Sequence, residues 1–180
     1  METGVRSRRS GAVFSAPMGR SVRFITWGAL GVLAAVVGFF WAAPEMPWIP
    51  RAAMTAFAAL LPLATWLFSV RGYEVRGGAL AIRRPAGLKR FSLAGLKEAR
   101  IDPQAMRMAL RLFGNGGLFC FCGWFWNRRL GKFRAYAADP RRAVVLVWQD
   151  RKLVVTPHDP EGFVQVLGAA QAAKRGEHGA

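Results

Sequence analysis

The chain has 180 residues and a formal net charge of +16, with 26 Lys and Arg against 10 Asp and Glu. So few acidic residues, with only two histidines, supply no paired carboxylates, no nucleophile beside a base and no metal-ligand set, so we predict no catalytic residue, metal or cofactor. The positive charge predicts attraction to polyanions, and because no nucleic-acid motif is present, an anionic membrane surface is the expected one.

Residues 1–21 are rich in Arg, Ser and Gly, a composition typical of disordered segments, and we predict a basic disordered N-terminus there. Two uncharged stretches follow within residues 22–71, at about 24–43 and 52–70. Each is about as long as a helix that crosses the hydrocarbon core of a bilayer. The proline-rich connection between them predicts that the chain crosses, turns and returns as a transmembrane helical hairpin.

Basic residues lie on both outer sides of this hairpin: Arg6, Arg8, Arg9, Arg20 and Arg23 before it, and Arg71, Arg76, Arg83, Arg84, Lys89 and Arg90 after it. The turn holds only Arg51. The positive-inside rule therefore predicts that both termini are cytoplasmic. A cleaved signal peptide is the alternative, since Ala42 and Ala43 suit a cleavage site, but the apolar region is too long and a second follows at once.

Alternation of apolar and polar residues begins at Gly72, which predicts one mostly β domain over residues 72–172. Residues 73–75 and 80–82 flank a two-glycine turn and are expected to pair as a hairpin. Further strands are predicted at 89–93, 96–101, 106–112, 132–137, 143–148 and 153–156.

Two segments of this domain carry more specific predictions. In residues 106–112 the apolar residues occupy the even positions, so we expect them to face the core and the arginines to face outward. A C-terminal amphipathic helix is predicted at about 160–173, with Asp159 as its N-cap and Pro160 in its first turn. Residues 173–180 read as a polar tail.

Four segments follow one another in the order seen in a known protein family: 111–117, 123–125, 130–136 and 156–163. On these segments the chain resembles the bacterial pleckstrin-homology (PH-like) domain family over about residues 72–168. The resemblance implies an α+β fold in which a mostly antiparallel β barrel or sandwich is closed by a C-terminal helix. It also implies a membrane-anchored form with the two-helix hairpin ahead of the domain, in the bacterial inner membrane. It implies a non-enzymatic binding role and supplies no ligand residues.

Residues 118–126 form the most apolar stretch outside the hairpin, and two arginines follow it closely. As a strand the stretch would place its aromatic rings in a core. As a loop it would enter the membrane boundary while the arginines hold phosphates, and both interpretations stay open. The candidate membrane and headgroup contacts are Arg83, Arg84, Arg128, Arg129, Phe119, Phe121 and Trp124, within a wider basic group that includes Lys89, Arg90, Lys132 and Arg134.

Three further features have structural interpretations. The glycines of residues 114–117 are expected to form a bulge or turn, because no Lys-Ser or Lys-Thr pair follows them as in a phosphate loop. Cys120 and Cys122 are expected to be buried or lipid-near thiols in a reducing compartment. His158, between two prolines, is expected to be a turn residue.

The predicted function is a membrane-anchored, non-enzymatic PH-like binding or scaffold protein that engages the membrane surface or a protein partner. The alternative is an accessory subunit of a membrane complex whose hairpin packs on other transmembrane helices. Gly28, Gly31 and Gly38 supply small surfaces for such packing, although they do not form a GxxxG repeat. The expected partners are the bilayer, anionic lipid headgroups, and a protein partner or further copies of the chain.

Overall fold

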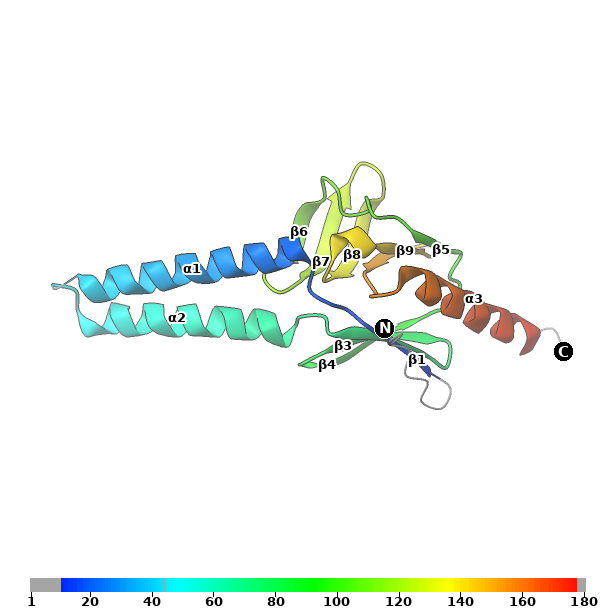
Figure 1. Cartoon of the computed structure of the whole chain (residues 1–180), viewed down its shortest axis with the longest axis horizontal. Helices are drawn as coiled ribbons and strands as arrows, with labels where there is room; N and C mark the ends of the chain where they lie inside the picture. Colours follow the sequence, from blue (N-terminus) through cyan, green and yellow to red (C-terminus); the bar gives the residue numbers. More distant parts are fainter. Residues whose placement is uncertain (1–10, 44, 178–180) are drawn as a thin grey trace.

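The computed structural model describes residues 11–43 and 45–177. Two long helices project side by side from a domain built of two sheets and a third helix (Figure 1). The elements in chain order are β1 (Gly11–Ser15), α1 (Arg20–Ala42), α2 (Trp48–Leu67), β2 (Gly72–Arg76), β3 (Ala79–Arg84), β4 (Gly87–Ser92), β5 (Glu98–Ile101), β6 (Leu110–Gly116), β7 (Phe121–Asn127), β8 (Gly131–Ala137), the 3-10 turn η1 (Pro140–Arg142), β9 (Val144–Val147), β10 (Lys152–Val155) and α3 (Pro160–Glu177).

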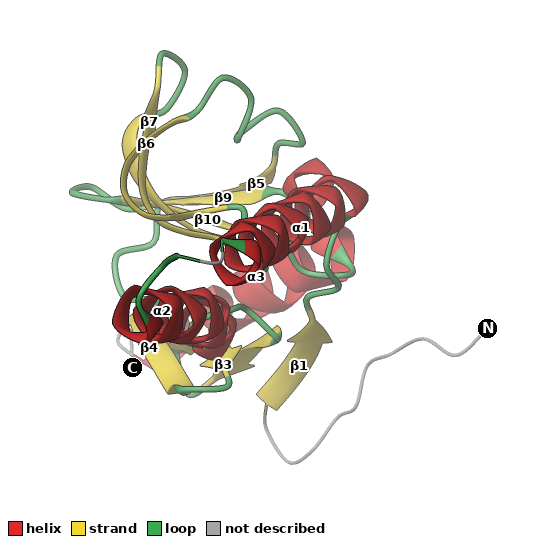
Figure 2. Cartoon of the chain, turned by 90° about the vertical axis from the view of Figure 1, so that its left-hand side faces the viewer, coloured by secondary structure: helices red, strands yellow, loops and turns green. Residues whose placement is uncertain are grey.

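The strands form two sheets, which Figure 2 shows as separate layers. One has four antiparallel strands in the order β1-β2-β3-β4, and the other has six in the order β5-β9-β10-β8-β7-β6. All pairs in the larger sheet are antiparallel except β8 with β10, which run parallel. The chain is therefore α+β with two mostly antiparallel sheets and a C-terminal helix, as expected.

The N-terminal segment differs from the prediction of disorder. Residues 11–15 form β1, which pairs with β2 so that Ser15 lies opposite Gly72. Phe14 points into the core and its ring meets Phe163 of α3 edge-on, with centroids 5.2 Å apart. The Ser15 carbonyl oxygen also accepts a hydrogen bond from the backbone N–H of His158 (2.8 Å). One buried aromatic side chain and a partner strand order a segment whose composition is typical of disorder, while residues 1–10 lie outside the described part.

The hairpin is inserted between two neighbouring strands of one sheet. The chain leaves the domain after β1, runs out along α1, returns along α2 and rejoins the sheet as β2. The helices differ from the predicted stretches, since α1 starts at Arg20 and α2 spans Trp48–Leu67. Pro50 sits in the first turn of α2, where a missing N–H costs little, so the helix starts earlier than the apolar run.

Contacts along the hairpin join its two helices near the outer end. The Trp41 indole Nε1 donates a hydrogen bond to the Thr55 hydroxyl group (3.1 Å), and Arg51 lies over the Trp41 ring. Further along α2, Pro62 interrupts the backbone ladder, and the Thr65 hydroxyl group donates to the Leu61 carbonyl oxygen (2.9 Å). Among the described residues, α1 is the one helix long and apolar enough to cross a membrane by length and composition.

The main core lies between the two sheets and under α3. Phe163 and Leu167 of α3 are fully buried there, and the β2–β3 turn at Gly77 and Gly78 has the positive φ angles that a tight hairpin needs. The Asp159 carboxylate accepts a hydrogen bond from the Gly162 N–H (3.0 Å), so the predicted cap is present. The helix continues to Glu177, where a polar tail was expected from residue 173, and residues 178–180 lie outside the described part.

A second, smaller core covers the other face of the larger sheet. It joins residues of β7, β8, β9 and β10 to the connection between β5 and β6, including the fully buried Ala105. The Asn127 side chain donates a hydrogen bond to the Ala105 carbonyl oxygen (2.8 Å) and fixes that connection to the sheet. These contacts hold residues 102–109 as a series of turns.

The prediction of a strand at 106–112 is wrong for the first half of the segment, and its apolar residues do not face the core as predicted. Residues 106–109 lie in the turns, and Met108 has a φ of 53° and an exposed fraction of 87%. Strand β6 starts only at Leu110, and Leu110 and Leu112 are exposed. Residues 110–114 are exposed on both faces of the strand, so no layer of the described structure covers these alternate apolar residues.

Candidate functional site

The base of the hairpin is attached to the domain at several points. On the α1 side, the Thr26 hydroxyl group accepts a hydrogen bond from the Phe119 N–H (3.0 Å), and Val22 is fully buried. On the α2 side, the Leu67 carbonyl oxygen accepts one from the Ala86 N–H (2.9 Å). Both helices therefore leave the domain in a fixed direction. The two loops that hold Phe119 and Ala86 lie at the base of the hairpin.

A cavity of about 410 Å³ opens at this base, between the end of α2 and the larger sheet. Its lining includes Thr65 and Phe68 at the end of α2, Arg84 at the end of β3, Trp124 of β7 and Arg134 of β8. Four elements that are distant in sequence thus contribute to one hollow, and two of the five side chains are cationic.

Both arginines of this cavity lie over aromatic rings. The Arg134 guanidinium carbon is 5.5 Å from the centre of the Trp124 ring and 5.4 Å from that of Tyr136. The Arg84 guanidinium carbon is 5.6 Å from the centre of the Phe68 ring. A guanidinium group is attracted to the face of an aromatic ring, so these contacts hold both groups in place.

The same arginines have hydrogen-bonding capacity that the protein does not use. The Nε atoms of Arg84 and Arg134 are buried and have no hydrogen-bond partner. Among the described residues neither guanidinium group forms an ion pair with a carboxylate. Two guanidinium groups without a carboxylate partner beside one cavity indicate a place for an anion from outside the chain.

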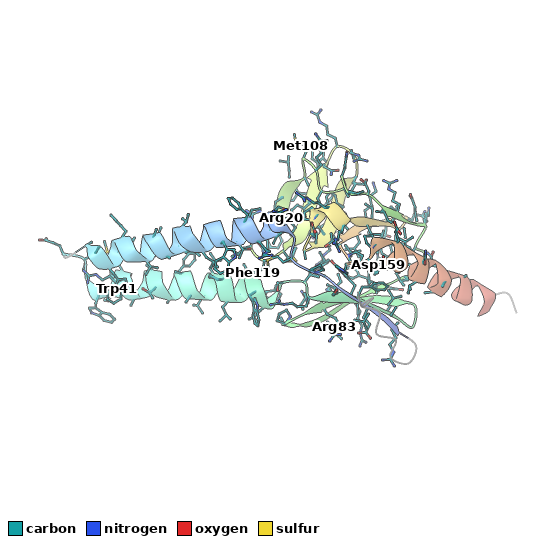
Figure 3. The ribbon with its side chains drawn as sticks, viewed as in Figure 1. Arg20, Trp41, Arg83, Met108, Phe119 and Asp159 are labelled. Atoms are coloured by element: carbon teal, nitrogen blue, oxygen red, sulfur yellow. A yellow bond between two sulfur atoms is a disulfide. The ribbon has the colours of Figure 1, made fainter. Side chains whose placement is uncertain are left out.

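The structure separates the predicted contact residues into different groups. Of the seven, Arg84 and Trp124 meet in the cavity, whereas Arg83 points to the opposite side of β3 and is exposed. Figure 3 labels Arg83 on the smaller sheet, away from Phe119 at the base of the hairpin. Arg128 and Arg129 lie in the turn between β7 and β8. There Arg129 forms an ion pair with Asp102 (3.3 Å).

The aromatic stretch 118–126 is divided between a turn and a strand. Phe119 precedes β7 with a φ of 64°, next to the first turns of α1. Within β7, Phe125 is buried in the smaller core, Phe121 and Trp124 are half-buried, and Trp126 is exposed. The strand interpretation thus describes residues 121–126, while Phe119 lies in a turn at the base of the hairpin.

Glycines allow β6 and β7 to approach closely at the cavity wall. The register shifts between Arg111 and Phe113, and Gly114 then pairs with Gly123. Their φ angles are 110° and 145°, and a Cβ atom at Gly123 would collide with the Phe113 carbonyl oxygen. The bulge lies at Leu112, just before the glycines. Gly114 and Gly116 pair regularly within β6, and the predicted turn begins only at Gly117.

The cysteines differ from the prediction of free thiols. Cys120 and Cys122 are joined in a disulfide, and no free cysteine occurs among the described residues. Their Cα atoms lie 5.8 Å apart, which is within the range that a disulfide can bridge, because side chains two residues apart in extended chain point the same way. Cys120 is fully buried beside the base of α1.

In the part of the chain that the structure describes, no group of three or more His, Cys, Asp and Glu side chains lies close enough together to hold a metal ion. His158 lies in the loop before α3, and its ring Nδ1 and its carbonyl oxygen both lie 2.6 Å from an Arg142 guanidinium nitrogen. These contacts link η1 to the loop between β10 and α3, so the histidine has a structural contact.

Sequence reasoning named Arg134 only as part of the wider basic group and did not name Phe68. Neither could be singled out, because a lone arginine on a strand and the last aromatic residue of an apolar run have no distinguishing pattern. What brings them together is the approach of α2 to β8 in space. The signal that the sequence does carry is the clustering of aromatic residues in 118–126.

Residues 71–170 match the family described as "Bacterial PH domain". The match covers more than half of the chain, and the chain belongs to this family of PH-like domains, which confirms the resemblance. The region matched begins at the end of the hairpin and ends within α3. Comparisons with curated proteins and with solved structures found no significant match. Family membership supports a binding or scaffold module.

Proposed function

We propose that this protein is a membrane-anchored, non-enzymatic binding module of the bacterial inner membrane, held there by α1 and α2 and presenting a basic PH-like domain to the cytoplasmic membrane surface. The observation that carries the proposal is the outward display of large apolar side chains along the hairpin. Exposed members are Phe24, Trp27, Val32, Phe39, Trp41, Trp48, Ile49, Phe57, Leu60, Leu63 and Trp66. Exposed apolar surface of this extent suits lipid rather than water.

The lengths and ends of the helices agree with a double crossing. With a rise of about 1.5 Å per residue, α1 is about 34 Å long and α2 about 30 Å, close to the thickness of the hydrocarbon core. Arg20 lies at the domain end of α1 and Trp41 at its far end (Figure 3). The tryptophans and Arg51 at the far end suit the opposite interface.

Strand pairing supports two crossings rather than one. Because β1 precedes α1 and β2 follows α2, and the two strands are hydrogen-bonded neighbours, both must lie on the same side of any membrane. If α1 crosses, α2 has to return, although its arginine and prolines make it less apolar than α1. The basic residues beside β2 and β3 then favour the cytoplasmic side.

A disulfide is unusual in the reducing cytoplasm, and only one of its two sulfur atoms is shielded here. Cys120 is fully buried, whereas Cys122 is half-buried and lines the cavity. Because a thiol can attack either sulfur, the bond argues against a cytoplasmic domain, and the reporter fusions below decide the point.

The topology is tested with a reporter enzyme that is active only in the periplasm. We expect a fusion after Ala180 to be inactive and a fusion after Met46, at the tip of the hairpin, to be active, with equal amounts of both fusions in the membrane fraction. Activity of the Ala180 fusion would overturn the cytoplasmic assignment, and recovery of the intact chain in the soluble fraction would overturn the anchor.

The second candidate function is an accessory subunit whose hairpin packs on other transmembrane helices or on further copies of the chain. It is favoured by Gly28, Gly31 and Gly38, because a Cβ atom built at any of them meets nothing within 4 Å. These small residues are not used against α2, and they leave a flat surface on α1. Copurification of another membrane protein, lost on changing Gly31→Leu, would favour this function over surface binding.

A further inference from the structure

We propose that the cavity at the base of the hairpin binds the phosphate headgroup of an acidic glycerophospholipid from the adjacent leaflet, with Arg84 and Arg134 as the two phosphate ligands. This inference rests on the proposed membrane anchoring and adds a defined ligand site to it. The cavity volume of about 410 Å³ is that of a small-molecule site.

The two arginines lack a negative partner within the described part of the chain. Both guanidinium groups line the cavity, and neither is paired with a carboxylate among the described residues. A guanidinium group presents parallel N–H donors that match the oxygens of a phosphate group. An anion in the cavity would supply the missing negative charge.

Aromatic rings already hold the two arginines in position. Arg134 lies between the rings of Trp124 and Tyr136, with Phe91 a further 6.0 Å neighbour, and Arg84 lies over Phe68. Stacking removes rotamer freedom before any ligand arrives, so less entropy is lost on binding. Scattered surface arginines, such as Arg83 and Arg128, have no such ring contacts among the described residues.

The position of the cavity favours a lipid over a free anion. The cavity lies beside the last turn of α2, where the apolar hairpin meets the domain. If the hairpin spans a bilayer, this place is level with the lipid headgroups. Its rim carries exposed aromatic side chains, Phe68 (53%) and Phe113 (77%), which suit an acyl chain and not water. The occupant must therefore be anionic at one end and apolar at the other.

The exposed edge strand β6 continues this surface. Figure 1 places β6 on the side of the domain from which the helices project. Leu110, Leu112 and Phe113 are exposed along it, with Met108 in the turn before it. Seated on the interface, this edge would close the lipid side of the cavity and keep the headgroup between the arginines.

The test uses the purified full-length chain in neutral detergent micelles, titrated with dioctanoyl phosphatidylglycerol and followed by tryptophan fluorescence. Dioctanoyl phosphatidylcholine and inorganic phosphate are titrated in parallel. We expect saturable binding of the phosphatidylglycerol and affinities at least about tenfold weaker for the other two. Equal binding of inorganic phosphate would overturn the lipid assignment, and equal binding of phosphatidylcholine would overturn the charge-based site.

Matched variants identify the residues. Arg84→Gln and Arg134→Gln should each weaken phosphatidylglycerol binding about tenfold or more, while Arg83→Gln, the neighbour on the opposite side of β3, should bind as the parent does. Arg134→Lys keeps the charge and should still lose affinity, because it lacks the planar fork. Equal losses in Arg83→Gln and Arg84→Gln would mean diffuse charge attraction and would overturn the proposal.

Failure of this inference is distinguishable from failure of the anchor. Thermal melts of each variant establish that the domain is folded, and the reporter fusions report the topology independently. A correctly inserted, folded chain that shows no saturable lipid binding overturns the cavity assignment alone.

Discussion

Tyr73 of β2 is fully buried, and its hydroxyl group joins three parts of the core. It donates a hydrogen bond to the Tyr136 carbonyl oxygen (2.6 Å) and accepts one from the Thr156 N–H (2.9 Å). The Thr156 hydroxyl group in turn accepts one from the Ala138 N–H (2.8 Å). The smaller sheet is thus linked to β8 and to the chain after β10 through a single phenol.

Burial raises the pKa of Tyr73 from 10.0 to about 12, although its hydrogen bonds with Thr156 oppose the rise. The phenol therefore loses its proton more readily in the unfolded chain than in the folded one. Its contribution to stability is complete below pH 10 and is lost as the pH rises through about 12.

Replacement Tyr73→Phe should lower the free energy of unfolding by about 1–3 kcal/mol, because two backbone groups lose their partner. It should also remove this tyrosine's share of the stability loss above pH 10. Denaturant unfolding of the full chain in detergent, repeated between pH 8 and 11, measures both. The control is Tyr136→Phe, whose hydroxyl group makes no hydrogen bond among the described residues. An equal loss in that variant would contradict the assignment.

At the scale of elements, β1 is the strand on which the placement of the hairpin depends. It supplies one of the two strands that flank the insertion, and its contribution to the core is mainly the Phe14 ring against Phe163. Nothing in the local composition marks this strand, because the segment is short and the partner that orders it lies more than fifty residues later in the chain.

Phe14→Ala should therefore destabilise the domain by about 3–5 kcal/mol, the usual cost of removing a buried aromatic side chain. Val13→Ala is the matched control, since Val13 is only half-buried and neighbours Phe14 on the opposite side of the strand. We expect its effect to be about 1 kcal/mol or less. Chemical denaturation of both variants compares them, and similar losses would mean that β1 is not part of the stable domain.

For the whole molecule, the hairpin is an insertion between two strands that pair with each other. Ser15 lies opposite Gly72, and the Ala16 N–H donates to the Arg71 carbonyl oxygen (3.3 Å), so these strands are already in hairpin register. A chain in which Asn-Gly joins Ala16 to Arg71 should fold as a water-soluble domain, because a two-residue turn suits this register.

A chain that starts at residue 72 is the comparison, since it lacks both β1 and Phe14. We expect the joined chain to give dispersed amide NMR signals and a cooperative melt, and the shorter chain to melt at a lower temperature or aggregate. If the two chains are equally stable, then β1 adds nothing and the insertion view is wrong.

Several elements follow from local patterns and were predictable for that reason. The turn at Gly77-Gly78 requires residues that accept positive φ angles, and α3 begins where Asp159 can cap it. The two apolar helices follow from the length of their uncharged runs. In each case the cause lies within a few residues of the effect.

The candidate site was predictable only in part, because its residues meet through long-range packing. Arg84 and Trp124 were expected to contact lipid, but Arg83, Arg128 and Arg129 were grouped with them although they lie elsewhere. Alternation in 106–112 indicated a core face, whereas Met108, Leu110 and Leu112 are exposed because no other layer packs on them. The spacing of apolar residues along a strand indicates which residues share a face of the strand. It does not indicate which other element, if any, covers that face.

By itself, then, the sequence determined the apolar hairpin, the β-rich domain with its capped C-terminal helix and the family to which that domain belongs. These properties arise from composition, periodicity and motifs along a continuous piece of chain. Only the tertiary structure decided that β1 completes the smaller sheet, that β6 is exposed, and that Arg84 and Arg134 share one cavity with Phe68 and Trp124. The physical reason is that pairing and burial depend on which distant segments come into contact.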